Sequence, residues 1–394
     1  RGLNRAGCDV IDIGQVPTPA LYFATFHLGT GSGISVTGSH NPPDYNGLKM
    51  VIGGVTLSGD TIQQLRVRIQ NKNFVTGQGA VSQADVRTAY LDRIANDVKL
   101  ARPMRVVADC GNGVAGELVP QLLKRLGCQV TELFCKIDGA FPNHHPDPSK
   151  PENLEDLIAE INQGGYDVGL AFDGDGDRLG VIAPDGHVIW ADRQMILYAR
   201  DVLSRHPGGE VIYDVKCSRT LDAEIRQAGG KPTMWKTGHS FIKAKLRETG
   251  ALLAGEMSGH IFFKERWYGF DDGLYTAARL LELLSRDPRP TQEVFSSLPN
   301  TVNTPELNLK FAEGEHHALI KQLVERAHFP DAKLTTIDGL RADFSDGFGL
   351  VRASNTTPVL VFRFEGNDEG ALKRIQKRFR ELVLAVRPDI SLPF

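Results

Sequence analysis

Acidic residues alternate with glycines in one short stretch of the sequence: Asp173, Gly174, Asp175, Gly176 and Asp177. The apolar run before it, residues 167–172, predicts a buried strand. In extended backbone, residues two apart point to the same side, so the three carboxylates can converge, whereas a helix would spread them over about 200°. Like charges repel unless a cation lies among them, and oxygen ligands suit Mg²⁺ or Ca²⁺. The spacing therefore predicts a metal-binding loop.

Two other interpretations of this loop share its alternating aspartates. An acidic surface turn has the same composition and remains an alternative. A calcium EF-hand also begins with alternating aspartates, but it needs Gly at its sixth position and Glu at its twelfth. Arg178 and Pro184 stand at those positions, which excludes an EF-hand.

Length and composition indicate an ordinary globular protein of two to four domains. The chain has 394 residues, is 41% hydrophobic and carries a net charge of −3. This charge favours neither nucleic acid nor an anionic membrane as a partner, and we find no apolar run that could span a bilayer. The five cysteines are an odd number without a CxxC pair, which predicts reduced thiols and a cytoplasmic location.

A serine lies where a strand meets a loop near the N-terminus. Residues 33–37 are strand-like and run into Gly38-Ser39-His40-Asn41-Pro42-Pro43, in which prolines restrict the backbone. The strand resumes at residues 47–51 and brings Lys49 close to the loop. Taken alone, this serine could equally be a turn residue.

A glycine motif follows the strand predicted at residues 105–109 and precedes a helical pattern. It consists of Gly111, Gly113 and Gly116, with Glu132 where a ribose-binding acid would stand. The spacing matches a dinucleotide-binding fingerprint, so an NAD-binding oxidoreductase is an alternative. Asp109 and Cys110 intervene before the first glycine, and Glu132 falls within a strand, which argues against it.

The order of strand, helix and strand recurs later in the chain, in what would be a third structural unit. Here a strand is predicted at 210–215, a helix at 219–228 and a strand at 232–235. Recurrence roughly every hundred residues predicts similar α/β domains in series. In the following loop Glu256, Ser258 and His260 alternate, so extended backbone would present them on one face, where they suit a polyhydroxy ligand.

The last part of the chain has a different, α+β pattern. Helices predicted at 315–328 and 370–384 flank hairpin-like strands. Between the strands lie Arg352, Ser354, Asn355 and Thr356, a composition suited to holding phosphate, although a polar hairpin turn would look the same.

Taken together, these loops resemble those of the α-D-phosphohexomutases, and most closely those of the bacterial bifunctional phosphomannomutase/phosphoglucomutase enzymes. The resemblance extends over essentially the whole chain. The motifs that carry it are T-G-S-H-N-P-P, D-G-D-G-D-R, G-E-M-S-G-H and R-A-S-N-T-T-P, in this order.

The resemblance implies a heart-shaped molecule around a central cleft, with three similar mixed α/β domains in series and a smaller C-terminal α+β domain. The expected domains are 1–85, 86–187, 188–299 and 300–394. It also implies a monomer that acts on small-molecule hexose phosphates in carbohydrate metabolism.

The chemistry implied by the resemblance is phosphoryl transfer through a phosphorylated Ser39. The ligands of Mg²⁺ would be Asp173, Asp175 and Asp177, together with the Ser39 phosphate. The enzyme would interconvert hexose 1-phosphate and hexose 6-phosphate through a hexose 1,6-bisphosphate, with glucose 1,6-bisphosphate as the primer. Because O3 and O4 have the same configuration in glucose and mannose, an enzyme that reads those hydroxyls would accept both sugars.

The resemblance also assigns roles to individual residues. The catalytic residues would be Ser39, His40, Lys49 and Arg178. The residues that line the sugar and phosphate path would be Arg193, Lys216, His239, Glu256, Met257, Ser258, Gly259 and His260. The residues that hold the non-reacting phosphate would be Arg352, Ser354, Asn355 and Thr356.

The sequence departs from the family at two points. The family's N-terminal segment, with its Tyr-Asp-Ile-Arg-Gly-like stretch, has no counterpart here, so we expect domain 1 to be incomplete. Gly38 stands where much of the family has Ala. The nearest alternative is phosphoglucosamine mutase, which typically carries Gln where Met257 stands; a phosphatase that hydrolyses phospho-Ser39 is another.

Overall fold

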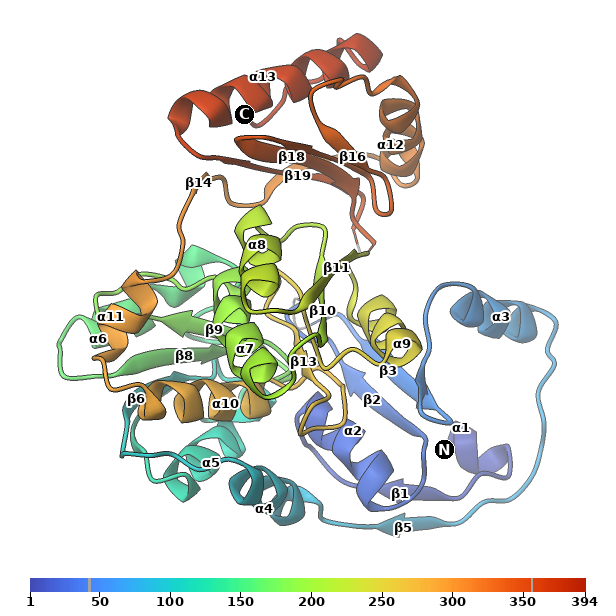
Figure 1. Ribbon diagram of the computed structural model, residues 1–394. Coiled ribbons are helices and arrows are strands. Elements are labelled where there is room, and N and C mark those ends of the chain that lie inside the picture. The colour runs from blue at the N-terminus through green and yellow to red at the C-terminus, as the bar shows by residue number, and fades with distance from the viewer. Residues whose placement is uncertain (42–43, 356) are drawn as a thin grey trace.

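The computed structural model describes residues 1–41, 44–355 and 357–394. Figure 1 shows four units along the chain. The C-terminal unit lies above the third unit, and the first and second units lie on the two sides of the third. Each unit has its own sheet or sheets. The series of α/β units followed by a C-terminal α+β unit is thereby confirmed.

The second unit contains a four-stranded sheet in the order β7-β6-β8-β9. The first three of these strands are parallel and β9 is antiparallel. Alternate residues of β8 enter different cores: Val168 and Leu170 pack into the main core, and Ala171 packs into a smaller one. The elements of this unit are α4 (Arg87–Asp97), β6 (Arg105–Asp109), η1 (Val114–Glu117), α5 (Val119–Arg125), β7 (Gln129–Leu133), η2 (Pro151–Leu154), α6 (Glu155–Ile161), β8 (Val168–Phe172) and β9 (Leu179–Ile182).

The third unit repeats this topology, with the order β11-β10-β12-β13 and an antiparallel last strand. The recurrence predicted from the strand–helix rhythm is therefore confirmed for these two units. The elements of the third unit are α7 (Ala191–Arg205), β10 (Glu210–Asp214), α8 (Arg219–Gln227), β11 (Lys231–Trp235), α9 (His239–Thr249), β12 (Leu253–Gly255), β13 (Ile261–Phe263), α10 (Gly273–Arg286) and α11 (Thr291–Ser296).

The first unit differs from the other two because its strands form two separate sheets, the parallel pair β1-β5 and the antiparallel set β2-β3-β4. Large apolar side chains remain exposed on it, among them Val36 and Leu48. Its elements are α1 (Gly2–Arg5), β1 (Val10–Asp12), α2 (Thr18–His27), β2 (Gly33–Thr37), β3 (Gly47–Ile52), β4 (Val55–Thr56), α3 (Gly59–Gln70) and β5 (Val81–Gln83).

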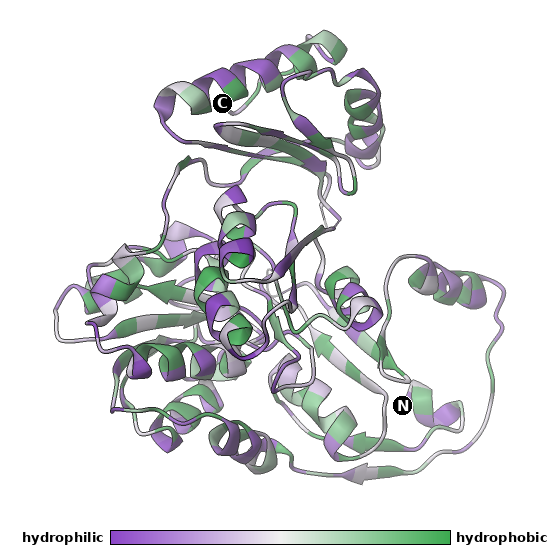
Figure 2. Ribbon diagram, in the orientation of Figure 1, coloured by the Kyte–Doolittle hydropathy of each residue, from purple (hydrophilic) through white to green (hydrophobic). Residues whose placement is uncertain are grey.

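The fourth unit is an antiparallel sheet with two helices, α12 and α13. In α13 the buried residues Ile375, Phe379 and Val383 recur every four positions, and Figure 2 shows the resulting mixture of hydrophobic and hydrophilic residues along this helix. The elements of this unit are β14 (Val302–Asn303), β15 (Leu307–Lys310), α12 (Glu315–Arg326), β16 (Lys333–Thr335), β17 (Leu340–Phe344), β18 (Gly347–Ala353), β19 (Val359–Gly366) and α13 (Glu369–Val386).

The first three units share one hydrophobic core, which includes Phe23 of α2, Leu170 of β8 and Leu274 of α10. The fourth unit has a core of its own. Its connection to the third unit includes two buried arginines: Arg341 donates to the carbonyl oxygens of Val215 and Cys217 at 2.6 and 2.7 Å, and Arg363 donates to the carbonyl oxygen of Lys216. A helix long and apolar enough to cross a membrane is absent from the part of the chain that the structure describes.

The contact between Gly116 and the segment after β7 leaves no room for a side chain. A Cβ added at Gly116 would lie 2.1 Å from the carbonyl oxygen of Cys135, whereas one added at Gly139 would meet nothing within 4 Å. We expect Gly116→Ala to destabilise the protein by about 1–3 kcal/mol through overpacking, and Gly139→Ala to melt like the wild type. Thermal melting of both variants tests this. Equal melting temperatures for the two would contradict the tight contact.

Candidate active site

The loop after β8 brings the three predicted carboxylates together through a turn. The Gly176 backbone N–H donates to the carbonyl oxygen of Asp173 at 3.0 Å, and Gly176 has φ +75°. The expectation that extended backbone makes these acids converge is therefore wrong. Convergence itself holds, because each of the three buried aspartates offers an oxygen within 4.8 Å of the others.

Lys49 balances part of this negative charge. Its Nζ lies 2.7 Å from Asp175 Oδ2 and 2.5 Å from Asp177 Oδ2. Burial opposes ionisation of Asp175, but the Lys49 charge and the hydrogen bonds from Lys49, Thr18 and Ser39 together outweigh burial and lower the pKa of that carboxyl. Burial and the neighbouring charges of Asp177 and Asp175 raise the pKa of Asp173 well above its usual value. Keeping all three carboxylates ionised therefore requires more positive charge than Lys49 alone supplies.

The same oxygens fit a divalent cation. Among the described residues, Asp175 Oδ1 and Asp177 Oδ1 are buried and have no hydrogen-bond partner. Buried carboxylate oxygens without partners are costly, and the carboxylates of three aspartates around one point match the all-oxygen ligand sets of Mg²⁺ and Ca²⁺. The donor set is thus suitable for the metal that the sequence predicted.

Ser39 comes from the first unit and packs directly on the acidic loop. A Cβ added at Gly174 would lie 2.1 Å from the Ser39 carbonyl oxygen, so only glycine permits this approach. The Ser39 Oγ lies 3.2 Å from Asp173 Oδ2 and 3.2 Å from His40 Nδ1. Burial, with the nearby Arg178 charge, lowers the pKa of His40 to about 3. His40 is therefore neutral at pH 7, with its Nδ1 within hydrogen-bond distance of the Ser39 hydroxyl.

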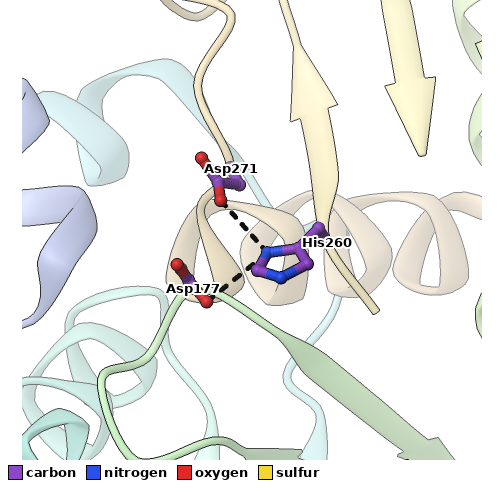
Figure 3. Close-up of side chains that lie close together, drawn as sticks. All are labelled: Asp177, His260 and Asp271. Carbon is purple, nitrogen blue, oxygen red and sulfur yellow. Dashed lines mark ion pairs between the residues drawn. The ribbon is translucent and has the colours of Figure 1, made fainter. Parts of the chain in front are cut away.

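Arg178 connects the acidic loop, residues 173–177, to residues 256–260 of the third unit, the predicted sugar-binding loop, called the sugar loop below. Its Nε donates to His260 Nε2 at 2.9 Å, while His260 Nδ1 faces Asp271 Oδ2 at 3.1 Å and Asp177 Oδ1 at 3.4 Å. Figure 3 shows His260 between these two carboxylates.

Asp177, His260 and Asp271 are close enough to be considered as a second metal-ligand group. Because Arg178 Nε can only donate, His260 Nε2 must accept, and the proton of the neutral ring is then on Nδ1. That tautomer leaves no lone pair on Nδ1 for a metal. Asp271 is also paired with Lys243 at 2.8 Å. This arrangement favours an ion-pair network over a metal site.

The sugar loop is a turn, and the expectation that Glu256, Ser258 and His260 share one face of extended backbone is wrong. The Gly259 N–H donates to the Glu256 carbonyl oxygen at 3.1 Å, and Gly259 has φ +99°. Ser258 Oγ donates to Glu256 Oε2 at 3.3 Å. Burial raises the pKa of Glu256. Met257 donates its N–H to Asp214 at 3.1 Å.

The predicted phosphate loop of the fourth unit lies against the third unit. Arg352 Nε donates to Asp338 at 3.0 Å, and Asn355 Nδ2 donates to the carbonyl oxygen of Thr237 at 3.2 Å. The buried Nη2 of Arg352 has no hydrogen-bond partner among the described residues, which suits an anion. Ser354 belongs to the same loop, and Thr356 lies outside the described residues.

Three other predicted substrate residues lie in the third unit. Lys216 Nζ is paired with Glu306 at 2.6 Å, and His239 Nδ1 lies 3.5 Å from Asp271, with its ring stacked on that of His260. Arg193 is not brought to the acidic loop. Its described partners are hydroxyl groups, those of Ser218, Thr220 and Thr301.

Several residues of this site were missed from the sequence. Thr18 donates to Asp175 at 2.6 Å, Asp147 lies 3.8 Å from Arg178, and His145 Nε2 contacts the carbonyl oxygen of His40. Asp271 completes the contacts of His260. These residues come from other units or from loops distant in the sequence.

The glycine motif proves to be a packing element. A Cβ on Gly113 would lie 2.8 Å from the Gly174 carbonyl oxygen, and one on Gly111 would lie 2.9 Å from Pro146. Protein atoms thus occupy the side from which a pyrophosphate would approach. Glu132 lies within β7 and pairs with Lys124 at 2.6 Å. The dinucleotide interpretation is therefore not supported.

Comparison with known proteins gives a consistent result along the whole chain. Four family models of phosphoglucomutase/phosphomannomutase match in order: α/β/α domain I at 1–76, domain II at 88–186, domain III at 190–302 and the C-terminal domain at 306–382.

Individual relatives agree with this. A phosphomannomutase/phosphoglucomutase of Pseudomonas aeruginosa is 55% identical over 394 residues, covering 100% of this chain and 85% of the relative. A phosphoglucomutase of Neisseria gonorrhoeae is 55% identical over 387 residues, covering 97% and 84%. The crystal structure of a Burkholderia thailandensis phosphoglucomutase/phosphomannomutase family protein has a TM-score of 0.93 at 54% identity, covering 100% and 86%. The chain therefore belongs to the phosphoglucomutase/phosphomannomutase family, the α-D-phosphohexomutases.

Proposed function

We propose that this phosphohexomutase moves a phosphoryl group between O1 and O6 of glucose and mannose phosphates, through phospho-Ser39 and a hexose 1,6-bisphosphate. The observation that carries the proposal is the position of Ser39. Its Oγ lies 3.2 Å from a carboxylate of the acidic cluster and 3.2 Å from the imidazole of His40. A hydroxyl between a cation-binding cluster and a neutral base is suited to accepting and releasing phosphoryl groups.

In this proposal Asp173, Asp175 and Asp177, together with the Ser39 side chain, hold Mg²⁺, which neutralises charge on the transferring phosphoryl group when it is bound. His40 accepts the Ser39 proton. Arg178, partly buried beside the cluster, offers a further positive charge to the phosphoryl oxygens. The raised pKa of Lys49, where the charges of Asp175 and Asp177 outweigh burial, favours an ammonium that keeps its proton and offsets the negative charge of the cluster.

The sugar would be held by the 256–260 turn and its phosphate by the fourth unit. Glu256 and Ser258 can accept from and donate to O3 and O4 of the hexose. Arg352 Nη2, which has no partner within the described part of the chain, would receive the phosphate that is not reacting. Ser354, Asn355 and Thr356 are proposed to bind the same phosphate. Lys216, His239 and Arg193 are proposed to line the same path.

The relatives support a sugar substrate but leave its range open. The Pseudomonas relative is named for both sugars, whereas the Neisseria relative, of equal identity, is named for glucose alone. The proposal of both sugars rests on the shared configuration of O3 and O4. Activity on glucosamine phosphate is the second candidate within the family, and Met257 disfavours it. Glucose 1,6-bisphosphate is the proposed primer.

We also propose the division into domains at residues 1–85, 86–187, 188–299 and 300–394. It is supported by the pairing of β1 with β5, which keeps residues 10–83 in one domain, and by the pairing of β14 with β19, which joins residue 302 to the C-terminal sheet.

Replacing the proposed nucleophile should abolish turnover without abolishing binding. We expect Ser39→Ala to lower mutase activity by at least about a thousandfold, because no other group takes the phosphoryl. Ser82→Ala, exposed on β5, is the control and should stay fully active. Intact-protein mass spectrometry should find one phosphoryl group on the wild type and none on Ser39→Ala. An active Ser39→Ala enzyme would refute the covalent intermediate.

Removing one carboxylate charge should weaken the metal site. We expect Asp175→Asn to lower the Mg²⁺ affinity by at least about tenfold, since even indirect changes around a metal cost about 10–100-fold. Isothermal titration calorimetry measures this without substrate. Asp60→Asn, on the exposed face of α3, should bind Mg²⁺ like the wild type. Unchanged affinity in Asp175→Asn would place the metal elsewhere.

Changing the proposed sugar contact should affect both sugars alike. We expect Glu256→Gln to lower kcat/KM by at least about tenfold, because a hydrogen bond to a charged group contributes about 1.5–3 kcal/mol. Coupled assays with glucose 1-phosphate and mannose 1-phosphate should show losses in kcat/KM that agree within about twofold. A twofold difference corresponds to ~0.4 kcal/mol in transition-state binding, which is small beside the loss of a hydrogen bond. A loss confined to one sugar would show that Glu256 does not read a feature common to both.

A further inference from the structure

Two thiols lie in the second unit, close to the acidic loop of residues 173–177, which is the proposed metal loop. Cys110 follows β6 and Cys135 follows β7, and their sulfur atoms are 3.5 Å apart. Cys110 is fully buried, whereas Cys135 is partly exposed. The proposed phosphoryl transfer uses neither side chain.

We propose that Cys110 and Cys135 are a modification site, at which a hydroperoxide forms a reversible disulfide that lowers the activity of the enzyme by displacing the metal loop. The formation of the bond does not depend on the substrate of the enzyme. Its effect on activity rests on the proposed function.

The reaction balances with a hydroperoxide as the only oxidant. The more accessible Cys135 thiol loses its proton and its sulfur attacks the peroxide, so that an S–O bond forms and the O–O bond breaks. The leaving oxygen takes up that proton, which gives a sulfenic acid and an alcohol, or water from hydrogen peroxide. The Cys110 sulfur then attacks the sulfenic sulfur, so that the S–S bond forms, the S–O bond breaks and water leaves with the Cys110 proton. The two thiols lose two electrons and the peroxide gains them. A dithiol reverses the bond by exchange.

The backbone already holds the two segments side by side. The Cys110 N–H donates to the carbonyl oxygen of Leu133 at 3.1 Å, and the Asn112 N–H donates to that of Phe134 at 2.8 Å. A disulfide needs an S–S distance of about 2.05 Å, so the sulfurs must approach by roughly 1.5 Å. Gly116 lies tightly against the Cys135 carbonyl and limits movement on that side. Much of the displacement therefore falls on the Cys110 loop.

That loop contacts the metal loop through backbone atoms. The Gly113 N–H donates to the Cys110 carbonyl oxygen at 2.7 Å, and the Val114 N–H donates to the Gly174 carbonyl oxygen at 3.0 Å. Gly174 stands between two of the proposed metal ligands and touches the carbonyl oxygen of Ser39. A shift of Cys110 thus reaches both the carboxylates and the nucleophile through close-packed backbone.

The test uses the full chain, treated with hydrogen peroxide and followed by peptide mapping and by the mutase assay. We expect a cross-linked peptide that contains both cysteines, and a loss of activity of at least about tenfold, since misplacing reacting groups by about 1 Å can cost a hundredfold. Dithiothreitol should restore activity and remove the cross-link. Cys135→Ser should keep its activity in peroxide, whereas Cys8→Ser, which removes an exposed thiol, should respond like the wild type.

Three outcomes would overturn the proposal. These are the absence of the cross-linked peptide in peroxide-treated protein, a cross-link that leaves activity unchanged, and an equal loss of activity in Cys135→Ser. Cys110→Ala serves as a second variant and should also resist peroxide. Because the cross-link is detected by mass, its absence is distinguishable from a wrong assignment of the substrate.

Discussion

The mutual repulsion of three buried carboxylates is the constraint on which the rest of this structure depends. Asp173, Asp175 and Asp177 come from one turn of the second unit, and that unit alone does not balance their charge. The first unit supplies the Lys49 ammonium and the Thr18 hydroxyl, and the third supplies His260. The charge balance of the site therefore depends on contacts among three units. The hydrophobic core that these units share holds them together by packing.

The fourth unit is attached differently. It has its own core, and much of its connection to the third unit is polar. Arg341 and Arg363 bind the backbone on both sides of Lys216, which is paired with Glu306. The residues proposed to do chemistry thus lie on a common core. The proposed phosphate clamp at Arg352 lies in the fourth unit, which meets the third through these polar groups and through a small apolar cluster of Val215, Phe348 and Leu350. A site that must hold either end of a hexose phosphate benefits when phosphoryl transfer and the binding of the non-reacting phosphate take place in different units.

The sequence was sufficient to predict much of this architecture. Strand 105–109 and the recurrence of strand and helix in the second and third units followed from hydrophobic periodicity, and the acidic loop followed from residue type and spacing. What failed was the local backbone: both the 173–177 and the 256–260 segments were expected to be extended, and both are turns with a glycine at positive φ. Alternating residue types carry no information about a turn whose hydrogen bonds close over a few residues.

Long-range partners were also beyond the sequence. Asp271 contacts His260 from the other side of β13, and nothing in its local pattern marks it. The glycines at 111, 113 and 116 fitted a nucleotide fingerprint, although they serve to let Gly174 and Cys135 approach. A glycine needed for backbone contact looks the same in sequence as a glycine needed for a ligand, and only the neighbouring atoms distinguish them.

The most direct test of the account follows the phosphoryl group itself. Enzyme carrying radioactive phosphate on Ser39 would be mixed with unlabelled glucose 1-phosphate and quenched after a single turnover. The account predicts that the label appears first in glucose 1,6-bisphosphate and then in glucose 6-phosphate, while the serine takes up unlabelled phosphate from the substrate. Label released as inorganic phosphate, or retained on Ser39 while unlabelled glucose 6-phosphate forms, would contradict it.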